Sequence, residues 1–134
     1  MKLKTMQAND KILIQQLTVV LTGQLEHYRE MRDLVRKMLS RVILSRGDLS
    51  GVIPCLEKKK KLLDTIESER QESSDLFIQW QNRKASIKED AAVTVLNSIL
   101  DQTEATIREF LDEEEQLKRY IEKNITKECS STAS

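Results

Sequence analysis

The sequence predicts an all-α protein: a single domain, residues 1–134, in which three long helices pack up-down-up as an antiparallel bundle, or a coiled-coil hairpin with a third helix. The 134 residues include only 3 glycines and 1 proline, too few for the turns of a β-sandwich or β-barrel. Charged residues make up 33% of the chain and aromatic residues 4%, a composition typical of long helices. Apolar residues also recur at alternating spacings of three and four, the period of a helix that buries one stripe.

The first predicted helix covers about residues 9–45. Asn9 or Asp10 can cap it, because a short polar side chain accepts a hydrogen bond from a free backbone N–H of the first turn. Gly23 lies in its middle, where a glycine costs about 1 kcal/mol against alanine but allows a neighbouring helix to approach closely. One polar residue interrupts the apolar stripe, which consists of Ile14, Leu17, Leu21, Gln24, Tyr28, Met31, Val35, Met38 and Val42.

The turn after this helix is marked by Arg46 and Gly47, a cation followed by a residue that tolerates the left-handed conformation. Pro54 lies shortly after the turn. Proline lacks an N–H and clashes with the carbonyl four residues back. Two alternatives are therefore open: residues 48–52 form a separate short turn and the second helix begins near Ile53, or that helix kinks at the proline.

The second predicted helix covers about residues 49–88. Its stripe is weaker than the first, because Lys59, Arg70, Ser73 and Lys84 interrupt it. These polar interruptions predict a bundle that does not close completely, which is typical of a protein that binds other helices. The stripe consists of Leu49, Val52, Leu56, Lys59, Leu63, Ile66, Arg70, Ser73, Phe77, Trp80, Lys84 and Ile87.

The third predicted helix covers about residues 90–127, with Asp90 as its cap and a frayed tail at residues 128–134. Nothing between Ser86 and Asp90 breaks a helix by composition, so one continuous helix through the second and third segments is an alternative. The phase of the apolar stripe changes at this point, which favours a turn. The third stripe consists of Val93, Leu96, Leu100, Thr103, Ile107, Phe110, Glu114, Leu117, Ile121 and Asn124.

Charge is distributed unevenly along the chain, although the formal net charge is zero. Residues 1–46 carry a formal charge of +5, residues 47–88 carry +1 and residues 89–134 carry −6. In an up-down-up bundle the first and third helices lie parallel, so the basic helix is expected beside the acidic one. The same segregation argues against binding to nucleic acid, which favours a net basic domain.

Motifs of common catalytic and metal sites are missing from the sequence. It has no Gly-rich nucleotide loop, and His27, expected to be solvated, is its only histidine. We therefore expect no enzymatic activity, no metal and no cofactor. Cys55 and Cys129 have no CxxC spacing and are expected to be reduced thiols. The chain begins without the apolar region of a signal peptide and has no apolar run long enough for a membrane span, so we expect a cytoplasmic protein.

Several charged and aromatic residues leave alternatives open. The run at residues 58–61 is either a solvated stretch of lysines or a patch for an acidic partner. The acidic run at residues 112–115 is either solvated or in contact with a basic segment, and Glu114 needs a partner if it is buried. Phe77 and Trp80 either pack in the core or anchor a partner helix.

A more specific pattern begins at the first turn. A long amphipathic helix ends in Gly47-Asp48-Leu49, and is followed by Leu56, Lys59, Leu62-Leu63, Ile66-Glu67 and Arg70. This pattern resembles the FlgN family of flagellar export chaperones, whose second helix has a Lys-x-x-Leu-Leu-x-x-Ile-Glu-x-x-Arg character. Asn97 with Leu100 also looks like the start of the third helix in that family. The resemblance covers roughly residues 10–125, and Pro54 departs from the family's usual start of the second helix.

The resemblance implies a cytoplasmic chaperone of the flagellar type III secretion system. Such a chaperone binds the amphipathic C-terminal helices of hook–filament junction proteins, prevents their premature assembly and delivers them to the export apparatus. The family's C-terminal region contacts the client, by helix-in-groove binding without chemistry. Carried onto this chain, the implied partner-binding residues are Leu96, Ile99, Leu100, Ile107, Phe110, Leu111, Leu117 and Ile121.

Two other functions compete with this interpretation. The first is a structural coiled-coil or adaptor protein without a client, which would have a closed apolar seam and would associate with itself. The second is a different secretion chaperone that binds flagellin rather than junction proteins. The sequence leaves the client and the oligomeric state open, with a homo-oligomer among the alternatives.

Overall fold

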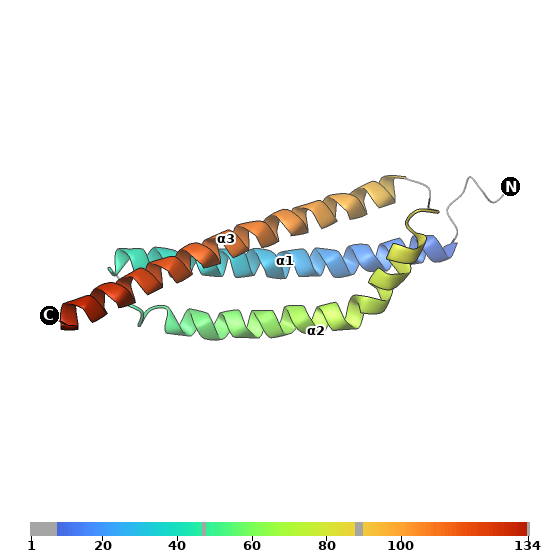
Figure 1. Ribbon diagram of the computed structural model, residues 1–134. Helices are drawn as coiled ribbons and strands as arrows, with labels where there is room; N and C mark the ends of the chain where they lie inside the picture. The colour runs from blue at the N-terminus through green and yellow to red at the C-terminus, as the bar shows by residue number, and fades with distance from the viewer. Residues whose placement is uncertain (1–7, 47, 88–89, 134) are drawn as a thin grey trace.

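The computed structural model describes the backbone of residues 8–46, 48–87 and 90–133, and the side chains of residues 9–46, 48–87 and 90–123. Within these ranges the protein is all-α, as predicted, and has no strand. Helix α1 spans Ala8–Leu44, α2 spans Ile53–Arg83 and α3 spans Ala91–Ala133 (Figure 1).

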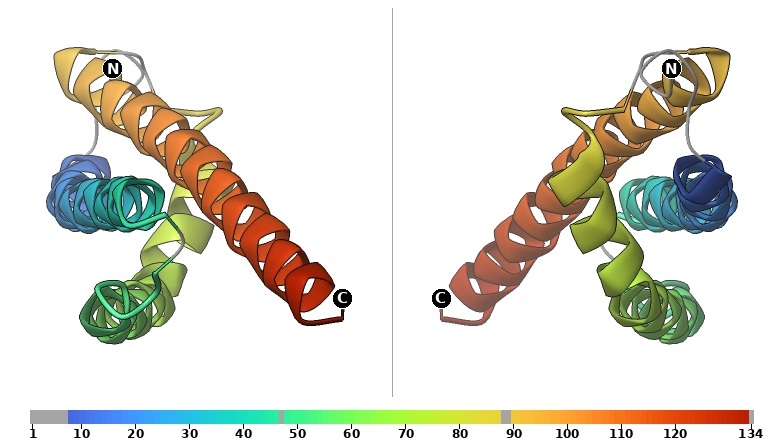
Figure 2. Two further views of the ribbon diagram at one scale, coloured as in Figure 1. Left: turned by 90° about the vertical axis from the view of Figure 1, so that its left-hand side faces the viewer. Right: turned by 90° about the vertical axis from the view of Figure 1, so that its right-hand side faces the viewer.

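Helix α1 lies between the other two helices and packs against both, more extensively against α3 than against α2. α1 and α3 run parallel and α2 runs antiparallel to them, which confirms the up-down-up order (Figure 1). In the described part of the chain, no Cα atom of α2 lies within 8 Å of a Cα atom of α3. The end-on views show α2 and α3 diverging from α1 in different directions (Figure 2). The bundle is therefore open between α2 and α3.

The first turn resolves the alternatives at Pro54. Helix α2 begins at Ile53, and Pro54 occupies its first turn, where the missing N–H removes no hydrogen bond. The expected helix start at residue 49 is therefore wrong, because residues 48–52 form the separate turn. In this turn Asp48 Oδ1 accepts a hydrogen bond from Ser50 N at 3.0 Å. This bond holds the pKa of the Asp48 carboxyl below its usual range.

Arg46, just after the end of α1, has a left-handed conformation with φ of 58°. The sequence-based assignment of that conformation to Gly47 lies outside the described residues. At the other end, α1 already begins at Ala8, so Asn9 and Asp10 lie within its first turn instead of preceding it. Within α1, a Cβ atom at Gly23 would stand 3.8 Å from Glu69 Oε2, an ordinary contact, so the packing does not require a glycine there.

Helices α2 and α3 are separate, as the change of apolar phase predicted. α2 ends at Arg83, earlier than the expected end at residue 88. Asp90 caps α3 as predicted, because its Oδ1 accepts hydrogen bonds from the backbone N–H groups of Ala92 at 2.9 Å and Val93 at 3.1 Å. The prediction that α3 ends near residue 127 and frays is wrong for residues 128–133, which continue the helix. No glycine or proline interrupts this segment, so nothing in its composition breaks the helix.

Two apolar clusters lie one after the other along the bundle. The hairpin core lies toward the α1–α2 turn and consists of Met31, Val35, Met38, Val42, Val52, Cys55, Ile66, Phe110 and Leu117. The N-terminal core lies toward the start of α1 and consists of Leu13, Ile14, Leu17, Leu21, Trp80, Val93 and Leu96. Between them is a polar layer of buried residues, Gln24, Ser73, Thr103 and Thr106.

The predicted stripes of α1 and α3 face these cores. Every member of the α1 stripe is buried except Tyr28, which is half-buried. All members of the α3 stripe with described side chains are buried or half-buried; Asn124 lies outside them. In α2 the stripe is displaced at two turns: Cys55 and Leu62 face the core, while Leu56 and Leu63 are 48% and 43% exposed. Trp80 is a core residue, which answers one of the open alternatives.

Ion pairs join the basic helix α1 to the acidic helix α3, as the charge distribution predicted. Arg36 bonds Glu113 at 2.8 Å and Glu109 at 2.9 Å, and Arg32 lies 3.3 Å from Glu109. The Glu113 hydrogen bond raises the pKa of Arg36 further above its usual range, so this cation is permanent. These pairs are partly exposed and contribute modestly to stability, and they add to the apolar packing of α3 on α1.

Candidate functional site

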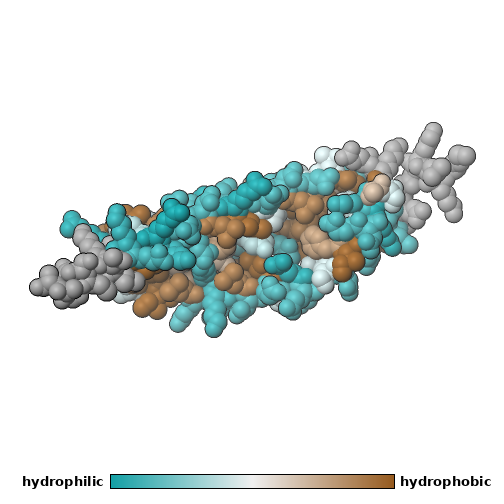
Figure 3. Space-filling view, in the orientation of Figure 1, coloured by the Kyte–Doolittle hydropathy of each residue, from teal (hydrophilic) through white to brown (hydrophobic). Residues whose placement is uncertain are grey.

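An apolar groove of about 660 Å³ runs between α2 and α3, with α1 as its floor. In the space-filling view, hydrophobic side chains gather along the seam between α3 and α2, and hydrophilic side chains border them on both sides (Figure 3). The groove is lined by Leu21, Gln24 and Tyr28 from α1, by Arg70, Ser74, Phe77 and Ile78 from α2, and by Leu100, Thr103 and Ile107 from α3.

The groove lies at the level of the polar layer, where the two apolar cores are interrupted. Ser73 Oγ donates to Glu69 O at 2.7 Å, and Ser74 Oγ donates to Gln71 O at 3.0 Å. Serine pairs that bond back to their own helix are typical sites of helix bending. Helix α2 bends in its yellow-green section, the part of the chain that contains this pair (Figure 1). Small polar residues and a bent helix leave too little apolar surface here to draw α2 and α3 together.

Gln24 lies in the floor of the groove with an unsatisfied amide. Its side chain is 4% exposed, and its Nε2 finds no acceptor in the described part of the protein. The hydroxyls of Thr103 and Ser73 donate to backbone carbonyls of their own helices, to Ile99 O at 2.7 Å and to Glu69 O at 2.7 Å, and neither accepts a hydrogen bond from Gln24. An unsatisfied buried amide is costly, of the order of 1–3 kcal/mol. The buried Nε2 of Gln24 therefore destabilises the folded protein.

Tyr28 and Arg70 are the other polar groups with free donors in the groove. Tyr28 follows Gln24 by one turn of α1, and burial raises the pKa of its phenol, although the positive charge of Arg70 opposes the rise. Arg70 is exposed, and its Nη1 lies 3.8 Å from Glu67 of the same helix. None of the residues that line the groove is acidic. The unsatisfied amide N–H, the phenol and the guanidinium thus all offer donors to the groove.

One ion pair connects the two walls toward the hairpin core. Lys59 Nζ of α2 donates to Glu114 Oε1 of α3 at 2.7 Å, with Lys59 only 16% exposed. This pair supplies the partner that Glu114 was expected to need. A second polar link joins α2 to α1, because His27 Nδ1 lies 2.6 Å from Glu69 Oε1. His27 is therefore half-buried and paired, and the expectation that it is solvated is wrong.

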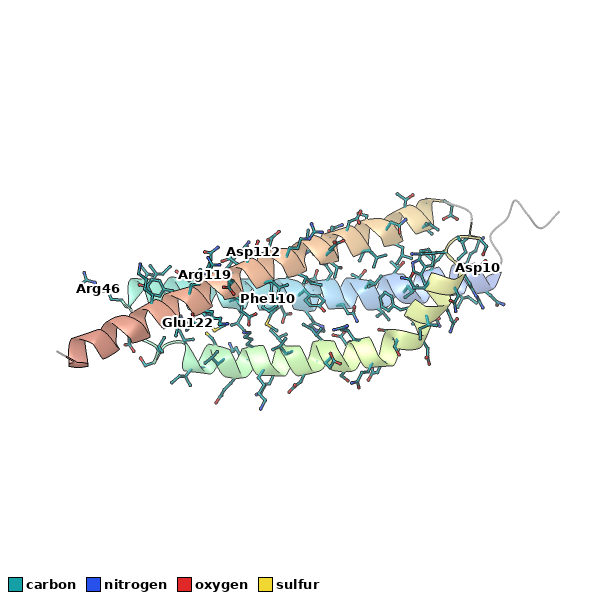
Figure 4. The ribbon with its side chains drawn as sticks, viewed as in Figure 1. Asp10, Arg46, Phe110, Asp112, Arg119 and Glu122 are labelled. Atoms are coloured by element: carbon teal, nitrogen blue, oxygen red, sulfur yellow. The ribbon has the colours of Figure 1, made fainter. Side chains whose placement is uncertain are left out.

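The residues implied by the family resemblance fall into three groups. Leu100 and Ile107 line the groove. Leu96, Phe110 and Leu117 are buried in the cores, and Ile99 and Ile121 are half-buried against them. Leu111 is 54% exposed. In Figure 4, Phe110 lies on the side of α3 that faces the other helices, whereas Asp112 lies on its outer side.

Most of the groove comes from α1 and α2, which the sequence-based assignment did not include. Gln24 was visible as the one polar member of the first stripe, and Phe77 was identified as an alternative anchor for a partner helix. The half-buried Phe77 lines the groove and packs on the N-terminal core, so both alternatives describe part of its position. Nothing in the sequence pattern singled out Ile78, which is 57% exposed on the α2 wall.

Other kinds of site were sought in the same ranges. The described residues contain no group of three or more His, Cys, Asp or Glu side chains placed to hold a metal ion. None of the described helical segments combines the length and the apolar character required to cross a bilayer. A comparison of the chain with protein-family models, curated proteins and solved structures finds no significant match.

Proposed function

We propose that the protein binds an amphipathic helix of a partner protein in the groove between α2 and α3. The observation that carries this proposal is that the backbones of α2 and α3 each approach α1 closely but not each other, which leaves an apolar channel over α1. A helix laid in this channel would bury its apolar stripe against Phe77, Leu100 and Ile107 and would complete a four-helix arrangement.

The client we propose is the amphipathic C-terminal helix of a flagellar hook–filament junction protein. This part of the proposal rests on the resemblance to the FlgN family, and a groove that suits an amphipathic helix is consistent with it. Bound in the cytoplasm, the client helix would be shielded from premature assembly until it reaches the export apparatus. The proposed activity is binding alone, without catalysis, metal or cofactor.

The open groove favours this proposal over a purely structural coiled coil. A protein of that kind was expected to have a closed apolar seam, whereas the seam here is interrupted by the polar layer. A flagellin chaperone would use the same groove for a different helix. Binding measured with C-terminal segments of both client types separates these two.

Substitution of Ile107 tests the assignment of the groove. Ile107→Asp places a charge on the α3 wall and is expected to weaken binding of a junction-protein C-terminal peptide by more than about tenfold, because the carboxylate loses water against an apolar stripe. Val95→Asp is the matched control, since Val95 lies on the same helix, is 51% exposed and is outside the groove. Affinity is measured by fluorescence anisotropy, and circular dichroism checks that both variants remain helical. Equal affinity of Ile107→Asp and wild type would contradict the proposal.

A further inference from the structure

Hydrogen-bond donors lie on neighbouring turns of the groove, and their chemistry restricts what can fill it. Gln24 Nε2 is buried on the floor without an acceptor. The Tyr28 hydroxyl, one turn further along α1, has no hydrogen bond to any described residue and faces the same groove. Arg70 brings guanidinium N–H groups from the α2 wall. A helix with only apolar residues at this level would leave the Gln24 amide unsatisfied in an even drier environment.

The group that matches these donors is one that accepts several hydrogen bonds. An ionised carboxylate has this property, with two oxygens that can take bonds from several donors. Bonds to a charged acceptor are also about twice as strong as neutral ones. Arg70 is the one charged side chain among the described lining residues, and among the charges that act on Tyr28 its attraction for a negative group is larger than the repulsion from Glu67 or from Glu69. Glu67 Oε2 lies 3.8 Å from Arg70 Nη1 on the exposed surface of α2, which leaves guanidinium donors available.

We infer that the helix bound in the groove carries a glutamate or aspartate in the middle of its apolar stripe, and that this carboxylate accepts a hydrogen bond from the Gln24 amide. This inference rests on the proposed function and deepens it, because it states which amphipathic helices are accepted. The pairing restricts the register of the bound helix, since a carboxylate that slides beyond Gln24 and Tyr28 would be buried without a donor. A single buried polar position fixes register in coiled coils for the same reason.

The test uses three synthetic peptides of about 21 residues, identical except for the central residue of the apolar stripe, which is Glu, Gln or Leu. Their affinities are measured by fluorescence anisotropy for wild type, Gln24→Leu and Gln16→Leu. Gln16→Leu is the matched control, because it is the same change at an exposed position of α1 outside the groove. Gln24→Leu removes an unsatisfied buried amide, so the variant is expected to fold.

Wild type and Gln16→Leu are expected to bind the Glu peptide at least about tenfold more tightly than the Leu peptide, with the Gln peptide between them. In Gln24→Leu the preference is expected to disappear or to reverse. If all three peptides bind wild type equally, or if Gln24→Leu keeps the preference for Glu, the inference is wrong while the groove remains a helix-binding site. If none of the peptides binds, the proposed function fails together with the inference.

Discussion

Gln24 lowers the stability of the free protein, but the proposal gives it a favourable role when a partner helix is bound. It interrupts an otherwise apolar α1 stripe, and its amide is buried without an acceptor. Replacing it by leucine removes the unsatisfied group at similar side-chain volume. Gln24→Leu is therefore expected to increase the free energy of unfolding by about 1–3 kcal/mol. Urea denaturation followed by Trp80 fluorescence measures the change, and lower stability than wild type would show that the amide is satisfied in solution.

Tyr28 makes the stability of the folded protein depend on pH in the alkaline range. Burial raises the pKa of its phenol in the folded protein above the value near 10 of the unfolded chain. The neutral phenol is thus favoured by folding, and this contribution is complete below the unfolded pKa and is lost as pH rises through the folded pKa. Tyr28→Phe is expected to lose less stability than wild type between about pH 9 and pH 11. Denaturation midpoints across this range test it, and identical slopes for the two proteins would exclude a contribution from Tyr28.

The ion pair between Lys59 and Glu114 links α2 to α3 across the open side of the bundle. Glu114→Gln is expected to lower stability by about 0.5–1 kcal/mol at low ionic strength, with a smaller loss in about 1 M salt, because screening weakens the pair. Glu115→Gln is the control, since Glu115 pairs with Arg119 inside α3 and links no second helix. An effect of Glu115→Gln as large as that of Glu114→Gln, measured by thermal unfolding, would argue against a role of the link between helices.

The separate helices show how far the sequence determines the fold. The α1 stripe was predictable because nearly every position in it is apolar, although Leu13 and Leu25 are buried beside it. The α2 stripe was displaced because two heptad registers share Ile66, Ser73 and Trp80. Each register also has apolar residues between these shared positions, so the sequence pattern alone does not choose between them. Leu62 and Leu63 are equally apolar, and only packing against α1 decides that Leu62 turns inward.

The groove was harder to predict than the helices, for a physical reason. Two features of the packed bundle decide which pair of helices stays apart. They are the ion pairs between α1 and α3 and the small apolar surface at the polar layer. The family resemblance placed the site on α3 alone, and of the residues it implied only Leu100 and Ile107 line the groove. The contributions of Gln24, Tyr28 and Arg70 follow from the relative placement of three helices, which the stripe of a single helix does not contain.

At the scale of the whole molecule, apolar surface holds both outer helices on α1, and charge adds to this on one side. The two apolar cores contain residues of α1, α2 and α3, and the Arg32 and Arg36 pairs add to the attachment of α3. Neither interaction draws α2 and α3 together at the polar layer. The molecule therefore has an apolar channel on the side where a closed three-helix bundle would have a seam.

The central claim is that a client helix lies between α2 and α3 and touches both walls. Isoleucine methyl NMR tests it most directly, because Ile78 and Ile107 stand on opposite walls, while Ile12 and Ile43 are exposed residues of α1 outside the groove. As a junction-protein C-terminal peptide is added, the Ile78 and Ile107 signals are expected to shift together at the same peptide concentration, with those of Ile12 and Ile43 unchanged. A shift confined to one wall, or a shift of Ile12 or Ile43 without Ile78 and Ile107, would contradict binding in the groove.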